Sequence, residues 1–348
     1  MDFDLSPEQR AIQAGVREFL AARSDLRAVR RHAEAGTYDA KLWKDVVGQG
    51  WSGIAVREDE GGAGLGHVEL ALVAEEFGYA CAPSPFFSNC AATIMLDAAS
   101  AEQRGRWLPG LLSGEAPGAV GMITRDGTSL VPDAGEAAVL VLVEGGRATL
   151  VARQDADVEP VAAVDITRPY FRVRSAGGEA LPGDVVGALD TVEVLLSAEI
   201  TGVATRAMEM AVEYAKQRTQ FDRPIGAYQA VSHRCADMLL AVESSRSATY
   251  FAAWTADADP VALAVAASVA KATAAETGWR VASSSLQVHG GIGFTWEHDL
   301  QFFLKRAAAD ARLFGSVAEH RERVAASYGL DRAAAPAGRP AQLATASA

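Results

Sequence analysis

The chain lacks the features of several large protein classes. Its 32 lysines and arginines are outnumbered by 44 aspartates and glutamates, which gives a net charge of −12. This balance argues against a nucleic-acid-binding protein, which needs a basic surface. The longest largely apolar run, 261–270, is too short to cross a bilayer. Because the first residues also have no basic or apolar signal-peptide segment, we expect a cytosolic protein.

Metal-ligand patterns and common catalytic signatures are absent from the sequence as well. The three cysteines, Cys81, Cys90 and Cys235, have no metal-ligand spacing and are interpreted as small buried side chains in a reducing compartment. The six histidines are scattered, so no metal site is expected. Neither glycine run, 61–66 or 290–293, has the G-x-G-x-x-G spacing of a dinucleotide-binding loop, and no G-x-S-x-G motif occurs.

The first third of the chain, residues 1–115, has the pattern of a helical domain. Ser6–Gln9 supplies an N-cap, a proline at the first helical position and a capping-box amide. Helical spacing of apolar residues resumes over 67–79, 86–98 and 101–112. These patterns predict a helical unit that ends near residue 115.

Residues 116–186 have a different pattern. The apolar runs 139–143 and 148–151, separated by two glycines, predict a β-hairpin. Residues 170–173 predict another strand. We therefore expect a small β domain over 116–186, shorter than either helical region.

Helical patterns return over residues 187–328. One apolar stripe runs from Leu196 to Tyr214, a second long helix is expected over 227–256, and a third follows Pro260 and ends near Val288. The fold class is therefore α+β, mainly α. Helices that are apolar on both sides indicate subunit association. The tail, 329–348, is rich in Ala, Pro, Gly and Ser, and we expect it to be disordered.

The most informative segment is 214–229, which ends one predicted helix and begins the next. It places Arg218, Phe221 and Gln229 at a tight turn. An arginine fork with amide and backbone donors suits a phosphate group. The glycines at 290–293 either end a helix as a C-cap or allow a cofactor to lie against the backbone.

Several separate segments resemble the acyl-CoA dehydrogenase family, and the resemblance covers residues 3 to about 328. In the C-terminal half it is carried by Arg218–Gly226, Gln229, Cys235–Met238 and Gln287–Gly293. In the N-terminal half it is carried by Leu5–Gln9, Glu58–Gly64 and Leu72–Gly78.

The resemblance implies an N-terminal helical domain, a middle β domain and a C-terminal four-helix bundle. It implies FAD as cofactor, an acyl-CoA thioester as substrate and an electron-transfer flavoprotein as acceptor. In the family, a glutamate removes the α-proton while hydride leaves the β-carbon. The cofactor lies across a subunit interface, where one subunit's C-terminal domain holds the phosphate and adenosine end of its partner's FAD.

The resemblance also assigns cofactor-binding roles to individual residues. Arg218 matches an arginine that binds the FAD pyrophosphate, Phe221 an aromatic residue beside the cofactor, and Gln229 a position on the adenosine side. The remaining contacts to the pyrophosphate fall on Gln287, Gly290 and Gly291.

The chain departs from the family at the ring-binding and catalytic positions. A Thr-Glu-Pro-x-x-Gly-Ser-Asp run of the family is replaced by Met122–Thr128, in which only Thr124 remains. The usual position of the catalytic glutamate falls on Ala318, and Glu319 comes one residue later. One residue turns a helical side chain by about 100°, so we interpret Glu319 as a solvated residue of a first helical turn.

A minority of family members place the base earlier in the chain, at a position that falls near Val192. Glu193 is adjacent and Glu199 lies about two helical turns further on, so both are candidate catalytic bases. Either would need a dry site that raises its pKa.

Three functional hypotheses remain open from the sequence. The first is a subunit of a heterotetrameric acyl-CoA dehydrogenase, of the kind found in bacterial steroid and acyl side-chain degradation, that contributes the ADP and pyrophosphate half of a shared FAD site. The second is an active homotetrameric dehydrogenase of β-oxidation type that uses Glu193 or Glu199. The third is a flavin-free structural or acyl-CoA-binding relative. The sequence does not identify the acyl group.

Overall fold

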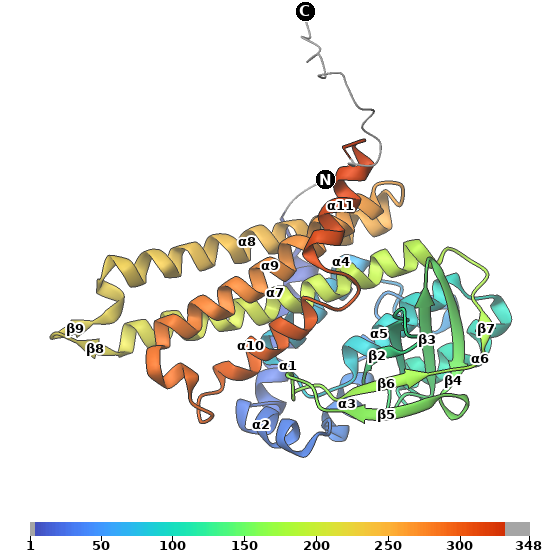
Figure 1. The fold of residues 1–348 in the computed structure, drawn as a ribbon, viewed down its shortest axis with the longest axis horizontal. Coiled ribbons are helices and arrows are strands. Elements are labelled where there is room, and N and C mark those ends of the chain that lie inside the picture. The colour runs from blue at the N-terminus through green and yellow to red at the C-terminus, as the bar shows by residue number, and fades with distance from the viewer. Residues whose placement is uncertain (1–3, 331–348) are drawn as a thin grey trace, which may run out of the picture.

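The computed structural model describes residues 4–330, which form an N-terminal helical region, a middle β region and a C-terminal helical region (Figure 1). No helix in this span is long and apolar enough to cross a membrane. The predicted tail from residue 331 onward lies outside the described residues.

Six helices make up the N-terminal region. They are α1 (Pro7–Arg23), α2 (Leu26–Ala35), α3 (Ala40–Gly48), α4 (His67–Ala80), α5 (Phe86–Met95) and α6 (Ala101–Ser113). The predicted capping box at Ser6 is confirmed, with the Gln9 N–H donating to Ser6 Oγ at 3.1 Å. Helix α5 is buried along its whole length, so it forms the centre of this region.

Helix α4 packs closely on α7 (Val185–Gln217) because two glycines lie at their crossing. A Cβ added at Gly78 would lie 2.0 Å from the Glu199 carbonyl oxygen, and one added at Gly202 would lie 1.8 Å from that of Glu75. Since no side chain fits there, the two backbones can approach. The crossing fixes the N-terminal region against the bundle.

The middle region contains two small sheets. One has the order β1-β3-β4-β7 and the other the order β2-β6-β5. The predicted hairpin is confirmed, with β3 and β4 antiparallel around Gly145 and Gly146, whose φ values are 54° and 80°. Strand β6 confirms the predicted strand at 170–173, whereas β1, β2, β5 and β7 were missed. The strands are β1 (Gly118–Met122), β2 (Ser129–Pro132), β3 (Val139–Glu144), β4 (Arg147–Ala152), β5 (Asp157–Val161), β6 (Tyr170–Arg174) and β7 (Glu179–Ala180).

The C-terminal region is built on long helices, as predicted. Helix α7 has 33 residues, which corresponds to about 50 Å, and it runs from the sheets to the far end of the bundle (Figure 1). The remaining helices are α8 (Gln229–Ala258), α9 (Leu263–His289), α10 (Leu300–Asp310) and α11 (Val317–Ser327). A two-stranded hairpin, β8 (Thr219–Gln220) and β9 (Arg223–Pro224), joins α7 to α8.

Short 3-10 turns connect several of these elements. They are Trp51–Gly53, Glu58–Glu60, Leu96–Ala98, Arg153–Asp155, Ile225–Ala227 and Gly290–Phe294. Cys81 and Cys90 are buried, as predicted, but Cys235 is only half-buried, since it lies near the exposed start of α8.

Candidate functional site

The β8–β9 hairpin projects from the end of the bundle that lies away from the middle sheets (Figure 1). Phe221 and Asp222 at its tip have φ values of 53° and 65°, the conformation of a type I′ turn. The Phe221 side chain is 86% exposed. The Arg223 guanidinium lies 4.0 Å from the centre of the Tyr228 ring, and the Tyr228 hydroxyl donates to the Gln220 carbonyl oxygen at 3.2 Å. These contacts fix the hairpin against Tyr228, while the apolar Phe221 side chain at its tip stays in solvent.

Two of the predicted cofactor residues at this hairpin present unused polar groups. Arg218 is exposed, and its guanidinium has no hydrogen-bond or ion-pair partner among residues 4–330. Gln229 is exposed at the first position of α8. A free guanidinium beside a helix N-terminus has the donors that an anion requires.

The predicted glycine segment lies at the same end of the bundle. The Tyr214 and His289 rings are stacked with centroids 4.7 Å apart, which places the end of α9 beside the end of α7. Helix α9 ends at His289, and Gly290, with φ 62°, is its C-cap residue, which confirms the C-cap interpretation. A Cβ added at Gly290 or Gly291 would meet nothing within 4 Å, and Gln287 is exposed. The backbone here is open to a ligand.

We call this set of six predicted residues, Arg218, Phe221, Gln229, Gln287, Gly290 and Gly291, the hairpin site. A free guanidinium, free amides and unshielded backbone fit a diphosphate and its sugar. All of these groups face solvent, so a second chain would be needed to cover a cofactor held there.

A crevice of about 740 Å³ lies between the middle sheets and the C-terminal helices. One wall comes from β1 and the residues around 161–165, and the other from Trp279 and the end of α10. Most lining side chains are apolar. The polar exceptions are Thr124, Asp165, Tyr170 and Arg312.

Thr124, the one retained residue of the ring-binding run, lies in the crevice lining. Its hydroxyl is bonded to Asp126, at 2.5 Å, and to the Thr128 carbonyl oxygen, at 2.8 Å. The crevice therefore offers space for a flat ring but few free polar partners. It fits the ring of a flavin less well than the hairpin site fits the phosphates.

The usual family position of the catalytic base holds no carboxylate that reaches the crevice. Ala318 lies in the first turn of α11, and Glu319 closes a capping box by accepting from the Ser316 N–H at 2.7 Å and its hydroxyl at 2.8 Å. Glu319 is exposed, so its interpretation as a first-turn residue is confirmed.

Glu193 is buried on α7 among charged groups from α9 and α11. Its carboxylate is 3.0 Å from Arg323 and 3.7 Å from His320. Burial raises the pKa of Glu193 to about 8, and Arg323 acts in the opposite direction. Among residues 4–330 it is not part of the crevice lining.

Glu199 is also buried and does not line the crevice within the described part of the chain. One of its oxygens accepts from Arg168 at 2.5 Å and from Arg306 at 2.6 Å. These arginines had no visible signal in the sequence, because each meets its partners through contacts more than 30 residues away. The role of Glu193 or Glu199 as a base stays a prediction.

No cluster of three or more His, Cys, Asp or Glu side chains in residues 4–330 could hold a metal ion.

Comparison with known proteins gives consistent family matches. The model of the acyl-CoA dehydrogenase N-terminal domain matches residues 6–115, and that of the C-terminal domain matches residues 185–329. Acyl-CoA dehydrogenase IpdE2 of Mycobacterium tuberculosis is 35% identical over 90% of this chain and 95% of its own length. IpdE2 of Mycolicibacterium smegmatis is 32% identical over 92% of this chain and 99% of its own.

Solved structures share the fold. A Tcur3481-Tcur3483 steroid ACAD variant superposes with a TM-score of 0.85 at 25% identity, covering 92% of this chain and 98% of the other. The ChsE4-ChsE5 complex from Mycobacterium tuberculosis gives 0.86 at 25% identity, covering 94% and 99%. Butyryl-CoA dehydrogenase from Megasphaera elsdenii, at 20% identity and 0.81, covering 94% and 100%, shows the fold alone.

Proposed function

Because this chain belongs to the acyl-CoA dehydrogenase family, whose cofactor is FAD, we propose that it is one subunit of a hetero-oligomeric acyl-CoA dehydrogenase. In this role it supplies the hairpin site, which holds the pyrophosphate and adenosine end of an FAD whose ring lies in a homologous partner subunit.

The observation that carries this proposal is the position of the hairpin site. Its residues are exposed at the end of the bundle away from the middle sheets (Figure 1), and Arg218 has no partner within residues 4–330. A half-site of this kind is completed by another chain. Two structural neighbours, Tcur3481-Tcur3483 and ChsE4-ChsE5, are named as pairs of proteins, which supports a mixed assembly.

The chemistry divides between the subunits in the same way. Dehydrogenation removes a proton from the α-carbon and a hydride from the β-carbon of the acyl-CoA, and a bound FAD supplies the hydride acceptor. In this chain Arg218, Gln229 and Gln287 would bind and orient the cofactor's phosphate and sugar groups. Ala318 has no carboxylate, and Glu193 and Glu199 are paired with arginines, so the base is expected in the partner subunit.

The test is to purify the chain alone and together with a homologous acyl-CoA dehydrogenase subunit, and to measure bound flavin and turnover. We expect little flavin and no turnover alone, and one FAD per pair in the complex. Arg218→Gln should reduce flavin content in the complex, whereas Arg31→Gln, an exposed arginine on α2, should not. Full flavin loading with turnover by the chain alone would contradict the proposal.

An active homo-oligomer is the second candidate, and the crevice in this chain is the observation that favours it. It predicts a yellow protein that reduces an acceptor with an acyl-CoA, an activity that Glu193→Gln or Glu199→Gln would abolish. A protein that binds no flavin with any partner would instead indicate a structural or acyl-CoA-binding relative.

A further inference from the structure

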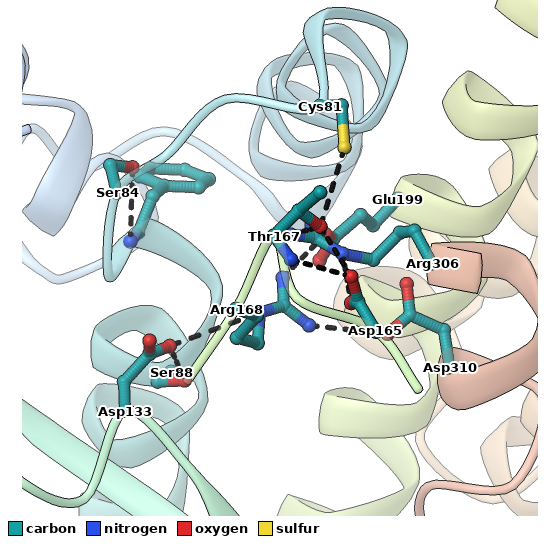
Figure 2. Close-up of polar contacts among 11 residues, drawn as sticks. Cys81, Ser84, Ser88, Asp133, Asp165, Thr167, Arg168, Glu199, Arg306 and Asp310 are labelled. Atoms are coloured by element: carbon teal, nitrogen blue, oxygen red, sulfur yellow. Dashed lines mark hydrogen bonds and ion pairs between the residues drawn. The ribbon is translucent and has the colours of Figure 1, made fainter. Parts of the chain in front are cut away.

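A buried network of charged side chains joins all three regions of the fold (Figure 2). It draws on the end of α4, on α5, on loops of the middle sheets, and on α7 and α10. We call it the buried arginine network. Its members are Cys81, Ser88, Asp133, Asp165, Thr167, Arg168, Glu199, Arg306 and Asp310.

Arg168, in the loop between β5 and β6, binds the bundle through two carboxylates. Its guanidinium is 2.5 Å from Glu199 on α7 and 3.2 Å from Asp310 on α10. A third carboxylate, Asp133, lies 3.8 Å away and accepts from the Ser88 hydroxyl of α5 at 2.6 Å. The Arg168 guanidinium also lies 4.9 Å from the centre of the Phe87 ring of α5, so this one side chain touches groups from all three regions.

Arg306, on α10, makes the reciprocal contacts. It donates to Asp165 at 2.8 Å and to Thr167 at 2.7 Å, both in the β5–β6 loop, and to Glu199 at 2.6 Å. Each arginine thus crosses between the loop and the helices, so the loop is fixed to α10 from both sides.

The charges in this network do not balance when every group is ionised. Within residues 4–330 it holds four buried carboxyl groups and two guanidiniums. Two oxygens of these carboxyl groups, Glu199 Oε2 and Asp310 Oδ2, have no hydrogen-bond partner in this part of the chain. An uncompensated buried charge is costly. A protonated carboxyl removes one charge and turns an acceptor into a donor.

The network also borders the crevice. Asp165, in the β5–β6 loop, and Tyr170, at the start of β6, line one wall. Ala309 and Ala311, which flank Asp310, line the other. The contacts Arg168–Asp310 and Arg306–Asp165 therefore connect the two walls. Their strength sets how firmly the walls are held together.

We propose that the buried arginine network is a proton-dependent contact that holds the two walls of the crevice together. The proton resides on the Asp310 carboxyl in the closed form, and its loss releases the β5–β6 loop from α10. Arg168, Arg306 and Asp310 are then positioning residues for the crevice, whatever molecule occupies it.

The electrostatic surroundings agree with this geometry. Burial, and then the nearby Glu199 carboxylate, raise the pKa of Asp310 to about 7, and burial raises the pKa of Asp133 to about 6. Burial also raises the pKa of the Tyr170 hydroxyl. The charged and titratable groups that act on Asp310 or are acted on by it are Arg168, Asp165 and Tyr170 from the middle region, Glu199 from α7, Lys271 from α9 and Arg306 from α10.

The sign of the pH effect follows from the raised pKa of Asp310. A carboxyl whose folded pKa is above its ordinary value of 3.8 contributes stability that is complete below that value. The contribution falls as pH rises from 3.8 toward 7 and is gone once pH has passed through about 7. The crevice walls should therefore be most tightly held in acid, loosen progressively as pH rises toward 7, and change no further above neutrality.

Hydrogen exchange of the full-length chain, corrected for the intrinsic pH dependence of exchange, tests the proposal. In the wild type, protection of residues 162–169 and 308–314 should fall by up to about tenfold per pH unit as pH rises toward 7, and should stay level above about pH 8. Asp310→Asn, which is neutral at every pH, should show no such slope in these segments. Glu193→Gln is the matched control, since it removes a buried α7 carboxyl outside the network and should keep the wild-type slope.

Glu199→Gln is the second variant, because it removes the charge that acts on Asp310 while keeping the shape of the side chain. It should lower the pKa of Asp310, so the loss of protection should level off at a lower pH than in the wild type. Wild-type protection that does not change between pH 5 and 7, or an unchanged slope in Asp310→Asn, would overturn the proposal. Loss of protection across the whole chain rather than in the two segments would also overturn it.

Discussion

The hairpin site and the buried arginine network use the same side chain in opposite surroundings. Arg218 stands in solvent without a partner in the described residues, whereas Arg168 and Arg306 are buried and each binds two or more groups. An exposed guanidinium contributes little to stability and stays free for an anionic ligand. A buried one is committed to its partners, and removing it leaves their charges uncompensated. One region is thus available for binding and the other for positioning.

The largest effect should come from removing a buried arginine. Arg306→Met leaves Asp165 and Glu199 without their 2.8 Å and 2.6 Å contacts. We expect a loss of about 3–5 kcal/mol in the free energy of unfolding, measured by urea denaturation. Arg218→Met should change it by less than about 0.5 kcal/mol. Equal losses in the two variants would remove the distinction between the two regions.

The next effect concerns pH and the second buried cluster, around Glu193. Its raised pKa, about 8 against an ordinary 4.5, means that its contribution is complete below 4.5 and is lost as pH rises through 8. His320, whose pKa is lowered to about 4, acts in the opposite direction up to its ordinary 6.5, so the clear window is pH 6.5–8.

Across that window the unfolding free energy of the wild type should fall by about 1–2 kcal/mol. Glu193→Gln should abolish this decrease. Glu319→Gln, an exposed glutamate that keeps its capping-box acceptor, should leave the dependence as in the wild type. Thermal unfolding at several pH values measures both. A wild-type slope in Glu193→Gln would show that its carboxyl is not the titrating group.

At the hairpin site the effect is expected in binding and not in stability. In the complex with its partner subunit, Arg218→Gln removes a charge-assisted contact to the cofactor and should weaken FAD binding by about 1.5–3 kcal/mol, roughly 10- to 150-fold. Flavin fluorescence during titration of the apo-complex measures this change, with Arg31→Gln as control. Unchanged affinity would contradict the assignment of Arg218.

The two regions also differ in how far the sequence predicts them. The hairpin site lies in two short continuous segments, so local features such as the turn at Phe221 and the C-cap at Gly290 were predicted from neighbouring residues. The three-part fold and the hairpin at 139–151 followed from periodicity in the same way. Local patterns specify local structure because they depend on contacts within a few residues.

The buried arginine network could not be predicted in this way. Arg168 meets Asp310, 142 residues further along, and Arg306 meets Asp165 at a separation of 141. No periodic pattern marks either arginine. For the same reason Glu199 was a candidate base in the sequence, although its carboxylate is bonded to two guanidiniums. The short strands β1, β2, β5 and β7 were missed because their pairing is set by distant partners.

The smallest expected effect comes from adding a single methyl group, which should weaken cofactor binding without changing stability. Gly291 has open space where a Cβ would stand, so Gly291→Ala should change the unfolding free energy by less than about 0.5 kcal/mol. The added methyl would stand where the pyrophosphate of FAD is proposed to approach the backbone, so the complex should bind FAD several-fold more weakly. Gly105→Ala on α6 is the matched control, because it also meets nothing within 4 Å and should, if anything, stabilise its helix. A Gly291→Ala complex with wild-type FAD affinity would show that the backbone at this glycine does not contact the cofactor, and would restrict the hairpin site to Arg218 and its neighbours.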